Sequence, residues 1–266
     1  MSTLAPDKSA ADQARFVRSR LPPGGLFGEH HWRISPTAFS LTAELAEELE
    51  SFGRVLLQFY RAVNLLYRQS VAGKQPAWVA QLLDQGKPAE MIELQRSPAL
   101  KNELPRVLRP DCLLTETGLA VSELDSVPGG LGLTAWLNLT YAQLAARVLG
   151  GEQGMMNGFA SIFGDAPKVH LIVSDESADY RPEMVWLAEQ LGSAQFKVQS
   201  PTFTGFAEGD GVYRFFELFD EANVPSARQL FALAGARQVR LTPPPKPIFE
   251  EKLLLALLWN RNLRGF

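Results

Sequence analysis

The chain has 266 residues, of which 46% are hydrophobic, and its formal net charge is −3. This length and composition suit one large or two small domains with a sizeable core. The Lys and Arg residues are scattered and give no basic field, so nucleic-acid binding is not expected. The N-terminal residues lack the apolar centre of a signal peptide, and the longest apolar run, residues 253–259, is far too short to cross a bilayer. We therefore expect a cytoplasmic protein that does not bind membranes.

The first 39 residues are polar and then rich in Pro and Gly, which predicts an irregular N-terminal arm over residues 1–39. His30 and His31 adjoin Glu29 in this arm. Adjacent histidines point in different directions on any regular element, and no further ligands recur at useful spacing, so a metal site is not expected there.

A long amphipathic helix follows the arm. Ser40 is the expected N-cap, and apolar residues recur at steps of three and four from Leu41 to Leu66. Two shorter helices are expected at residues 77–83 and 88–94. The region 40–104 is therefore predicted to be helical and to serve core packing rather than a site.

A β-hairpin is predicted next. Two short apolar runs, residues 112–114 and 119–121, flank Glu116-Thr117-Gly118, which suits a three-residue loop with a left-handed glycine in the last position. In that register Thr115 pairs with Leu119. The single cysteine, Cys112, lies in the first strand and is expected to be a small buried hydrophobe.

The predicted register opposes Asp111 to Glu123 and Arg109 to Asp125, with all four side chains on one face of the hairpin. Like charges opposite each other destabilise a sheet unless a cation lies between them, and carboxylate oxygens suit Mg²⁺. The alternative is a solvated hairpin face with incidental acids and a nearby salt bridge.

A glycine-rich loop leaves the hairpin. After Ser126 the chain reads Val-Pro-Gly129-Gly130-Leu-Gly132, and Thr134 is expected to cap a helix that runs to Gly150. Such a loop before a helix N-terminus can hold a phosphate or a substrate carboxylate, and a plain strand-to-helix connection is the alternative.

The remaining pattern is of the α/β class. A buried strand at residues 169–173, a helix with Pro182 in its first turn and Gly192 past its end, and a strand at 196–198 predict a βαβ unit and a parallel sheet. The turn after the first strand is acidic and lacks the G-x-G-x-x-G fingerprint, so a dinucleotide site is not expected. Further elements are expected at residues 212–216 (strand), 226–233 (helix) and 238–241 (strand).

The hairpin pattern resembles a known family. Arg109-x-Asp111 and, twelve positions after the aspartate, Glu123-x-Asp125 with a Ser/Pro/Gly loop resemble the metal-binding hairpin of the circularly permuted ATP-grasp proteins, the group that contains glutathionylspermidine synthase. The resemblance implies that the segment from Arg109 to Asp111 contacts ATP and that Asp111, Glu123 and Asp125 hold Mg²⁺. This chain has Asp125 where the family has Asn, and a different loop after it, which leaves the substrate open.

The C-terminal segment carries a second similarity. Lys246, Lys252 and the Leu-rich run to Trp259 resemble the Trp-Lys, Asn-Lys and Leu-Leu-x-x-Leu-Trp segment of the same family. The resemblance implies that Lys252 contacts the nucleotide phosphates and, less directly, Lys246. The alternative is a lysine whose stem lies along the start of a buried helix.

Together these patterns predict a mixed α/β fold that resembles an incomplete circularly permuted ATP-grasp fold. Its expected parts after the arm are a helical region (40–104), the metal-site hairpin with the following helix (105–150), an α/β substrate-side subdomain (151–245) and the start of a nucleotide-binding part (246–266).

The expected function is that of an Mg-ATP-binding component of a ligase that joins a small-molecule or peptide carboxylate to an amine through an acyl phosphate. Arg109 is expected to stabilise the transferred phosphate, and Ser126, Gly129 and Gly130 are weaker candidates for substrate contacts. We expect no ligase activity from this chain alone and either self-association or docking of a separately encoded second half. The alternative is a non-catalytic interaction or scaffold domain that retains the fold.

Overall fold

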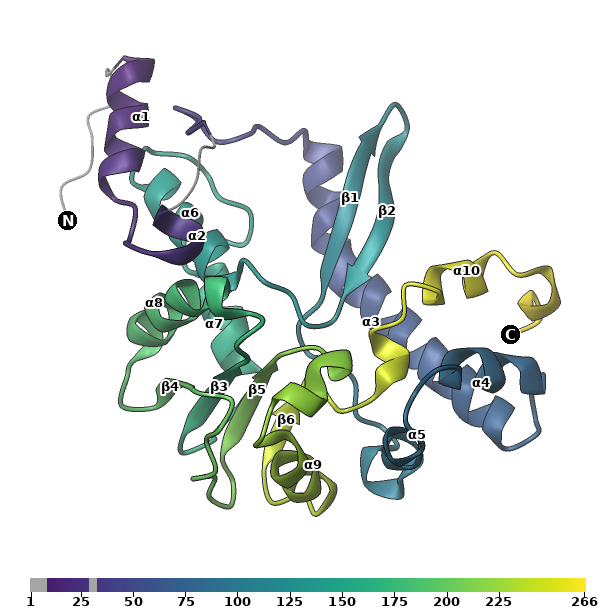
Figure 1. Ribbon diagram of the computed structural model, residues 1–266. Helices are drawn as coiled ribbons and strands as arrows, with labels where there is room; N and C mark the ends of the chain where they lie inside the picture. Colours follow the sequence, from purple (N-terminus) through teal and green to yellow (C-terminus); the bar gives the residue numbers. More distant parts are fainter. Residues whose placement is uncertain (1–8, 29–32) are drawn as a thin grey trace.

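The computed structural model describes residues 9–28 and 33–266. Figure 1 shows an α/β layer, a two-stranded hairpin and a set of helices on the other side of the hairpin. The mixed α/β class and the parallel sheet expected from the sequence are confirmed. The adjacent histidines His30 and His31 lie outside the described residues.

Two described parts of the segment 1–39, which was predicted to be an irregular arm, are helical instead. Helix α1 (Ala10–Ser19) begins at Ser9, whose hydroxyl accepts a hydrogen bond from the Asp12 N–H at 3.2 Å, and a short helix α2 (Gly25–Gly28) follows. Val17 and Phe27 are buried against Trp136, with the two aromatic rings 6.0 Å apart. Tertiary packing therefore stabilises helices in a segment whose polar and Pro/Gly-rich composition predicted no regular secondary structure.

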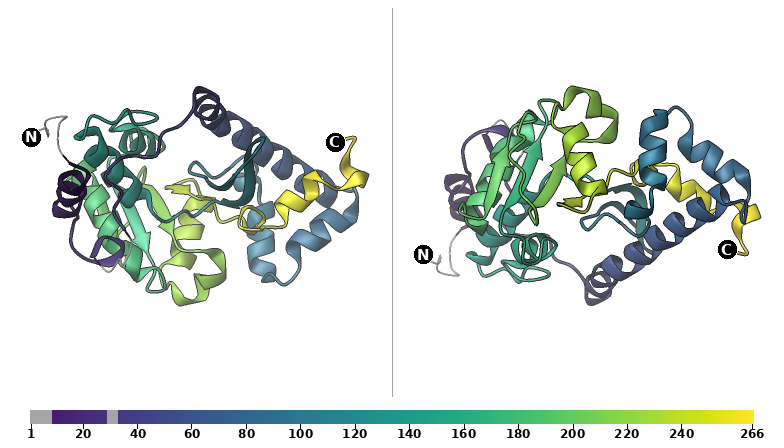
Figure 2. Two further views of the ribbon diagram at one scale, coloured as in Figure 1. Left: turned by 90° about the horizontal axis from the view of Figure 1, so that it is seen from above. Right: turned by 90° about the horizontal axis from the view of Figure 1, so that it is seen from below.

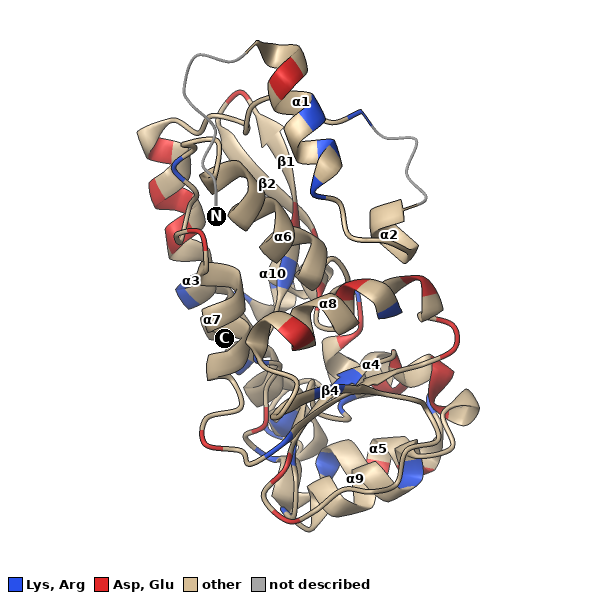
Figure 3. Ribbon diagram, turned by 90° about the vertical axis from the view of Figure 1, so that its left-hand side faces the viewer, with Lys and Arg blue, Asp and Glu red and all other residues tan. Residues whose placement is uncertain are grey.

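Helix α3 (Ala43–Val71) begins two residues later than predicted. Thr42 rather than Ser40 is the N-cap, and its hydroxyl accepts the Leu45 N–H at 3.3 Å. Glu44 lies in the first turn of this helix, where the helix dipole favours negative charge, and Figure 3 shows further acidic residues in its N-terminal half. Helices α4 (Ala77–Asp84) and α5 (Ala89–Arg96) and the short 3₁₀ helix η1 (Pro98–Leu100) follow as predicted for a helical region.

Strands β1 (Arg109–Thr115) and β2 (Gly118–Asp125) form the predicted antiparallel hairpin. The hairpin lies alongside α3 in every view (Figures 1 and 2), and its turn residue Gly118 approaches the Glu48 carboxylate of that helix. The base of the hairpin is directed toward the α/β layer.

The larger sheet is parallel and has the strand order β4-β3-β5-β6. Strands β3 (Val169–Val173) and β5 (Gly211–Phe215) are buried at every residue, as expected for the central strands of a sheet covered on both faces. Helix α8 (Arg181–Leu191) connects β3 to β4 (Phe196–Gln199), and α9 (Ala227–Gly235) precedes the edge strand β6 (Arg240–Thr242). The predicted βαβ unit is therefore confirmed.

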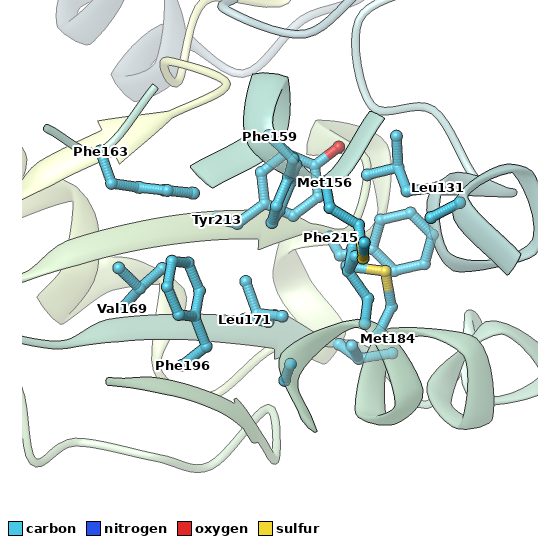
Figure 4. Packing of buried hydrophobic residues seen from close by; sticks show 14 of the residues in the cluster. Leu131, Met156, Phe159, Phe163, Val169, Leu171, Met184, Phe196, Tyr213 and Phe215 are labelled. Carbon is cyan, nitrogen blue, oxygen red and sulfur yellow. The ribbon is translucent and has the colours of Figure 1, made fainter. Parts of the chain in front are cut away.

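Two hydrophobic clusters cover the two faces of this sheet. The first contains Phe159, Leu171 and Tyr213 (Figure 4). It lies against helices α6 (Leu131–Ala142), α7 (Gly154–Ser161) and α8. The second contains Ile172 and Val212 and lies against α9. A third cluster joins α3 and α4 to the C-terminal segment through Tyr60 and Phe249.

Helix α6 (Leu131–Ala142) differs from its prediction at both ends. Thr134 lies within its first turn, because Gly130 takes the N-cap position with φ +80°. The helix ends at Ala142, well before the predicted end at Gly150. Just after this end, Ala145 adopts φ +63° and the Ala146 N–H donates to the Tyr141 carbonyl. Helix α7 (Gly154–Ser161) is separate.

The C-terminal segment consists of short pieces: η4 (Pro247–Phe249), α10 (Leu254–Leu258) and η5 (Arg261–Leu263). The remaining 3₁₀ helices are η2 (Ala178–Tyr180) and η3 (Leu218–Asn223). Within residues 9–28 and 33–266, no helix combines the length and apolar character needed to cross a membrane.

Candidate functional site at the hairpin base

The four charged residues predicted to share a hairpin face do so. Asp111 pairs with Glu123 and Arg109 with Asp125 across the two strands. Arg109 Nε lies 3.1 Å from Asp111 Oδ1, and Arg109 Nη2 lies 3.3 Å from Asp125 Oδ2. One guanidinium therefore bridges two carboxylates that lie on opposite strands.

The register nevertheless differs from the prediction at the turn. Thr115 pairs with Gly118, not with Leu119, so the loop between paired positions contains only Glu116 and Thr117. A β-bulge opposite the Asp111/Cys112 step leaves Ser122 unpaired and shifts the register by one. The shift restores the predicted pairing at the base, which is why the site residues face each other although the turn was predicted one residue out.

Lys252 reaches the same face from the C-terminal segment. Its Nζ lies 2.7 Å from Glu123 Oε1, and the Glu123 carboxylate raises the pKa of the lysine through this hydrogen bond and its charge. Asp125 and Glu217 contribute further negative charge around Lys252. Two cations and several carboxylates thus converge at the hairpin base, although Lys252 is far from the hairpin in sequence.

Glu217, which no sequence pattern predicted as a site residue, also belongs to this group. Glu217 lies just beyond the carboxyl end of β5, and burial, followed by the charges of Glu250 and Asp125, raises its pKa. An acid that follows the carboxyl end of a buried parallel strand is a usable signal, because binding sites of open α/β sheets lie at that edge. The base of the hairpin therefore meets the carboxyl edge of the sheet.

Asp125 also organises the loop that follows it. Its Oδ1 accepts the Val127 N–H at 2.8 Å, while the Ser126 side chain is 2% exposed and its hydroxyl has no hydrogen-bond partner among the described residues. The Tyr60 and Tyr213 hydroxyls are also buried without such partners, and the Asp125 charge helps to raise the pKa of both after the larger effect of burial. A polar region with unused hydroxyls therefore lies around Asp125.

The glycine loop does not present a free helix N-terminus to a ligand. The buried Glu183 carboxylate of α8 accepts the Gly130 N–H at 2.7 Å and the Leu133 N–H at 2.8 Å. An internal carboxylate thus takes the place that was predicted from the glycine-rich sequence for a bound phosphate or substrate carboxylate. Gly129 contributes differently, since its carbonyl accepts a hydrogen bond from Arg109 Nη1 at 3.2 Å.

Close packing explains two of the glycines in this loop. A Cβ atom on Gly129 would lie 2.2 Å from Cε1 of Tyr180, and a Cβ on Gly132 would lie 2.2 Å from the Glu183 carbonyl oxygen. The loop is therefore fixed against η2 and α8, and it holds Arg109 in position through the Gly129 carbonyl.

Lys246, the weaker candidate for a nucleotide contact, is buried and connects parts of the fold. It is 1% exposed and donates to the Asn64 side chain and to the carbonyls of Leu100, at 3.2 Å, and Glu103, at 3.1 Å. These contacts use its three donors and connect α3, η1 and the C-terminal segment. Lys252, with its side chain 77% exposed, is the lysine that a ligand can reach.

The hairpin base offers carboxylate oxygens, which are the ligands that a hard divalent cation prefers. Asp111, Glu123 and Asp125 offer carboxylate oxygens on one face and are only partly covered. Arg109 and Lys252 occupy these oxygens, and no three His, Cys, Asp or Glu side chains of the described residues are gathered closely enough to hold a metal ion. A cation would therefore displace internal ion pairs when it binds.

No protein-family model matches the chain, and no curated protein sequence matches it either. The assignment of a function therefore depends on the geometry of the hairpin base.

Proposed function

We propose that this chain binds Mg-ATP at the base of the β1–β2 hairpin and is an ATP-grasp-like component of a ligase that joins a carboxylate to an amine. The observation that supports this most is the opposition of Asp111 to Glu123 at the carboxyl edge of the parallel sheet, next to the Arg109–Asp125 pair. Two opposed carboxylates are unfavourable in a hairpin unless a cation compensates them.

In this proposal Asp111, Glu123 and Asp125 hold the metal. A Mg²⁺ ion held there would supply neutralisation of the negative charge that develops on the phosphate during phosphoryl transfer. Arg109 is already held by the Gly129 carbonyl and by two carboxylates, and its remaining donors would bind phosphate oxygens from this fixed position. No side chain of the chain acts as a nucleophile.

Lys252 has two roles in the proposal. Without a ligand it pairs with Glu123, and with Mg-ATP bound it would be free to pair with the phosphates, because the metal would then neutralise Glu123. Its exposed side chain allows this movement with little structural cost. The substrates in this proposal are a small-molecule or peptide carboxylate and an amine. Ser126 is buried, so among the loop residues Gly129, whose carbonyl accepts from Arg109, is the one that adjoins the proposed nucleotide ligands.

The second candidate function is a non-catalytic interaction domain. The ion pairs of Arg109 with Asp111 and Asp125, and of Lys252 with Glu123, favour it because they satisfy the acids without a metal. Calorimetric titration of ATP with and without Mg²⁺ separates the two. Mg-dependent binding supports the ligase component, and absence of binding under both conditions supports the interaction domain.

Substitution of Asp125 sharpens this experiment. Asp125→Asn keeps an oxygen ligand and the acceptor for the Val127 N–H, so we expect Mg-ATP binding to persist. Asp125→Ala removes both and should abolish it. Equal binding by the two variants would contradict the metal role of Asp125.

A further inference from the structure

A cavity of about 170 Å³ lies beside β6, the edge strand of the parallel sheet. Three segments that are distant in sequence form its wall: residues 99–106, residues 162–163 at the end of α7, and residues 234–245 around β6. Its size is close to that of cavities that accept a benzene-sized molecule. The cavity is separate from the hairpin base, because Arg240 lies at the amino end of the parallel strands.

The wall of this cavity is strongly basic. Arg106, Arg237 and Arg240 line it, with Glu103 as its one acidic residue among those described. Arg106 Nη1 donates to the Ile162 carbonyl at 3.1 Å, and Arg240 Nη1 donates to the Phe163 carbonyl at 2.9 Å. The end of α7 thus orients two guanidinium groups whose Nε and Nη2 atoms make no hydrogen bond to the described part of the chain.

Arg237 provides an independent observation. It adopts φ +59° directly after α9, where the Arg237 N–H donates to Ala234 and the Gln238 N–H to Leu233. Glycine is the usual residue in this left-handed position, because a side chain there is strained. Its guanidinium has no hydrogen bond or ion pair with any residue in the ranges 9–28 and 33–266. Arg237 thus occupies a backbone position that favours glycine, and its guanidinium is available to bind a ligand.

We propose that this cavity binds a phosphate group, either inorganic phosphate or the phosphate of a phosphomonoester. Guanidinium groups match the oxygens of phosphate with paired hydrogen bonds, and three of them balance a dianion and the nearby Glu103. Asp165, which is 88% exposed and pairs with Arg240 at 2.6 Å, is the internal competitor for this site. The bound phosphate would connect the segment before β1 to the end of α9.

The test is calorimetric and thermal-shift titration of the whole chain with inorganic phosphate, in EDTA and at constant ionic strength maintained with chloride. The EDTA removes divalent cations, and Asp111→Asn tests the hairpin base separately. We expect saturable binding of one phosphate per chain that Asp111→Asn leaves unchanged. Absence of saturable binding, or its loss in Asp111→Asn, would overturn the proposal.

Arg237→Gly distinguishes a lost ligand contact from a damaged fold. Glycine relieves the left-handed strain, so this variant should have a higher Tm than the wild type without phosphate and yet bind phosphate at least about tenfold more weakly. Arg228→Ala, on the preceding helix α9 but outside the cavity wall, should bind like the wild type. Unchanged phosphate affinity in Arg237→Gly would overturn the proposal.

Two further titrations test the competition by Asp165 and the kind of phosphate that binds. Asp165→Asn removes the competitor of Arg240 and should bind phosphate more tightly, and weaker binding would contradict the competition. Glycerol 3-phosphate distinguishes the two sources of phosphate: tighter binding than inorganic phosphate supports a phosphomonoester, and weaker binding supports the free ion.

Discussion

The ammonium of Lys252 lies 2.7 Å from Oε1 of Glu123, so the segment before α10 is tied to the basal half of strand β2. The contact joins the two sequence patterns from which an ATP site was expected. It places an exposed cation next to the proposed metal ligands.

The first prediction concerns this contact. Lys252→Ala should leave the Tm nearly unchanged, because exposed ion pairs add little stability, but should weaken Mg-ATP binding about tenfold through loss of a charge-assisted contact. Calorimetric titration measures the effect, and Lys74→Ala, at an exposed position after α3, is the control. Equal affinity of Lys252→Ala and the wild type would remove Lys252 from the nucleotide site.

The second prediction concerns Glu183. Glu183→Gln replaces one acceptor oxygen by a donor and leaves the N–H of Gly130 or Leu133 unpaired, so it should lower the unfolding free energy by about 1–3 kcal/mol. The exposed Glu189→Gln on the same helix should have almost no effect. Chemical denaturation of the three proteins at pH 7 provides the comparison.

The same residue should affect the pH dependence of stability. Burial raises the pKa of Glu183 above its usual 4.5 and outweighs the opposing backbone hydrogen bonds. The folded protein then holds this proton more tightly than the unfolded chain. The resulting stabilisation is fully present below pH 4.5 and is lost as the pH rises through the raised pKa. Glu183→Gln should lack this fall, and an identical pH profile would contradict the assignment.

The third prediction concerns Lys246. Burial, and secondarily the charge of Arg68, lowers its pKa from 10.5 to about 8. The unfolded chain binds more protons between these values, so the unfolding free energy of the wild type should rise by on the order of 3 kcal/mol from pH 8 to pH 10.5. Lys246→Met should lose this rise, whereas Lys197→Met on the exposed side of β4 should keep it. Denaturation at a series of pH values tests it, and parallel curves for Lys246→Met and the wild type would contradict it.

The fourth prediction concerns the close contact of Gly129 with Tyr180. The Tyr180 ring also packs edge-on against Phe215 at 5.4 Å, which limits its movement. Gly129→Ala should therefore lower the unfolding free energy by about 1–3 kcal/mol. Gly158→Ala, in open space within α7, should instead raise it by about 0.5–1 kcal/mol. A neutral Gly129→Ala would show that the loop moves away from η2.

The sequence allowed prediction of the parts of the site that depend on local pattern. The apolar runs around the turn predicted the hairpin, and the pairing of Asp111 with Glu123 agrees with the prediction because the bulge offsets a turn predicted one residue out. Apolar runs with Pro and Gly punctuation located the βαβ unit. The bulge at Ser122 was not predicted, because nothing in its immediate neighbours distinguishes it from a regular strand residue.

Long-range contacts account for most of the differences between the predicted elements and the structure. Glu183 caps a helix that begins about fifty residues earlier in the chain, so local cap residues predicted the wrong start for α6. The N-terminal helix α1 is fixed by burial of Val17 in a cluster with Phe27 and Trp136, which composition cannot reveal. Glu217 could not be predicted as a site residue, because the sequence does not show that β5 ends beside the hairpin base.

The most direct test of the central claim is electron paramagnetic resonance of Mn²⁺, used in place of Mg²⁺, with the whole chain and ATP. We predict one bound Mn²⁺ per chain with coupling to the phosphorus nuclei of ATP. Glu123→Ala, which removes the oxygen ligand, should lose the bound ion, and Glu116→Ala at the exposed turn should keep it. Bound Mn²⁺ that is unaffected by Glu123→Ala, or no bound Mn²⁺ in the wild type, would contradict a metal–nucleotide site at the hairpin base.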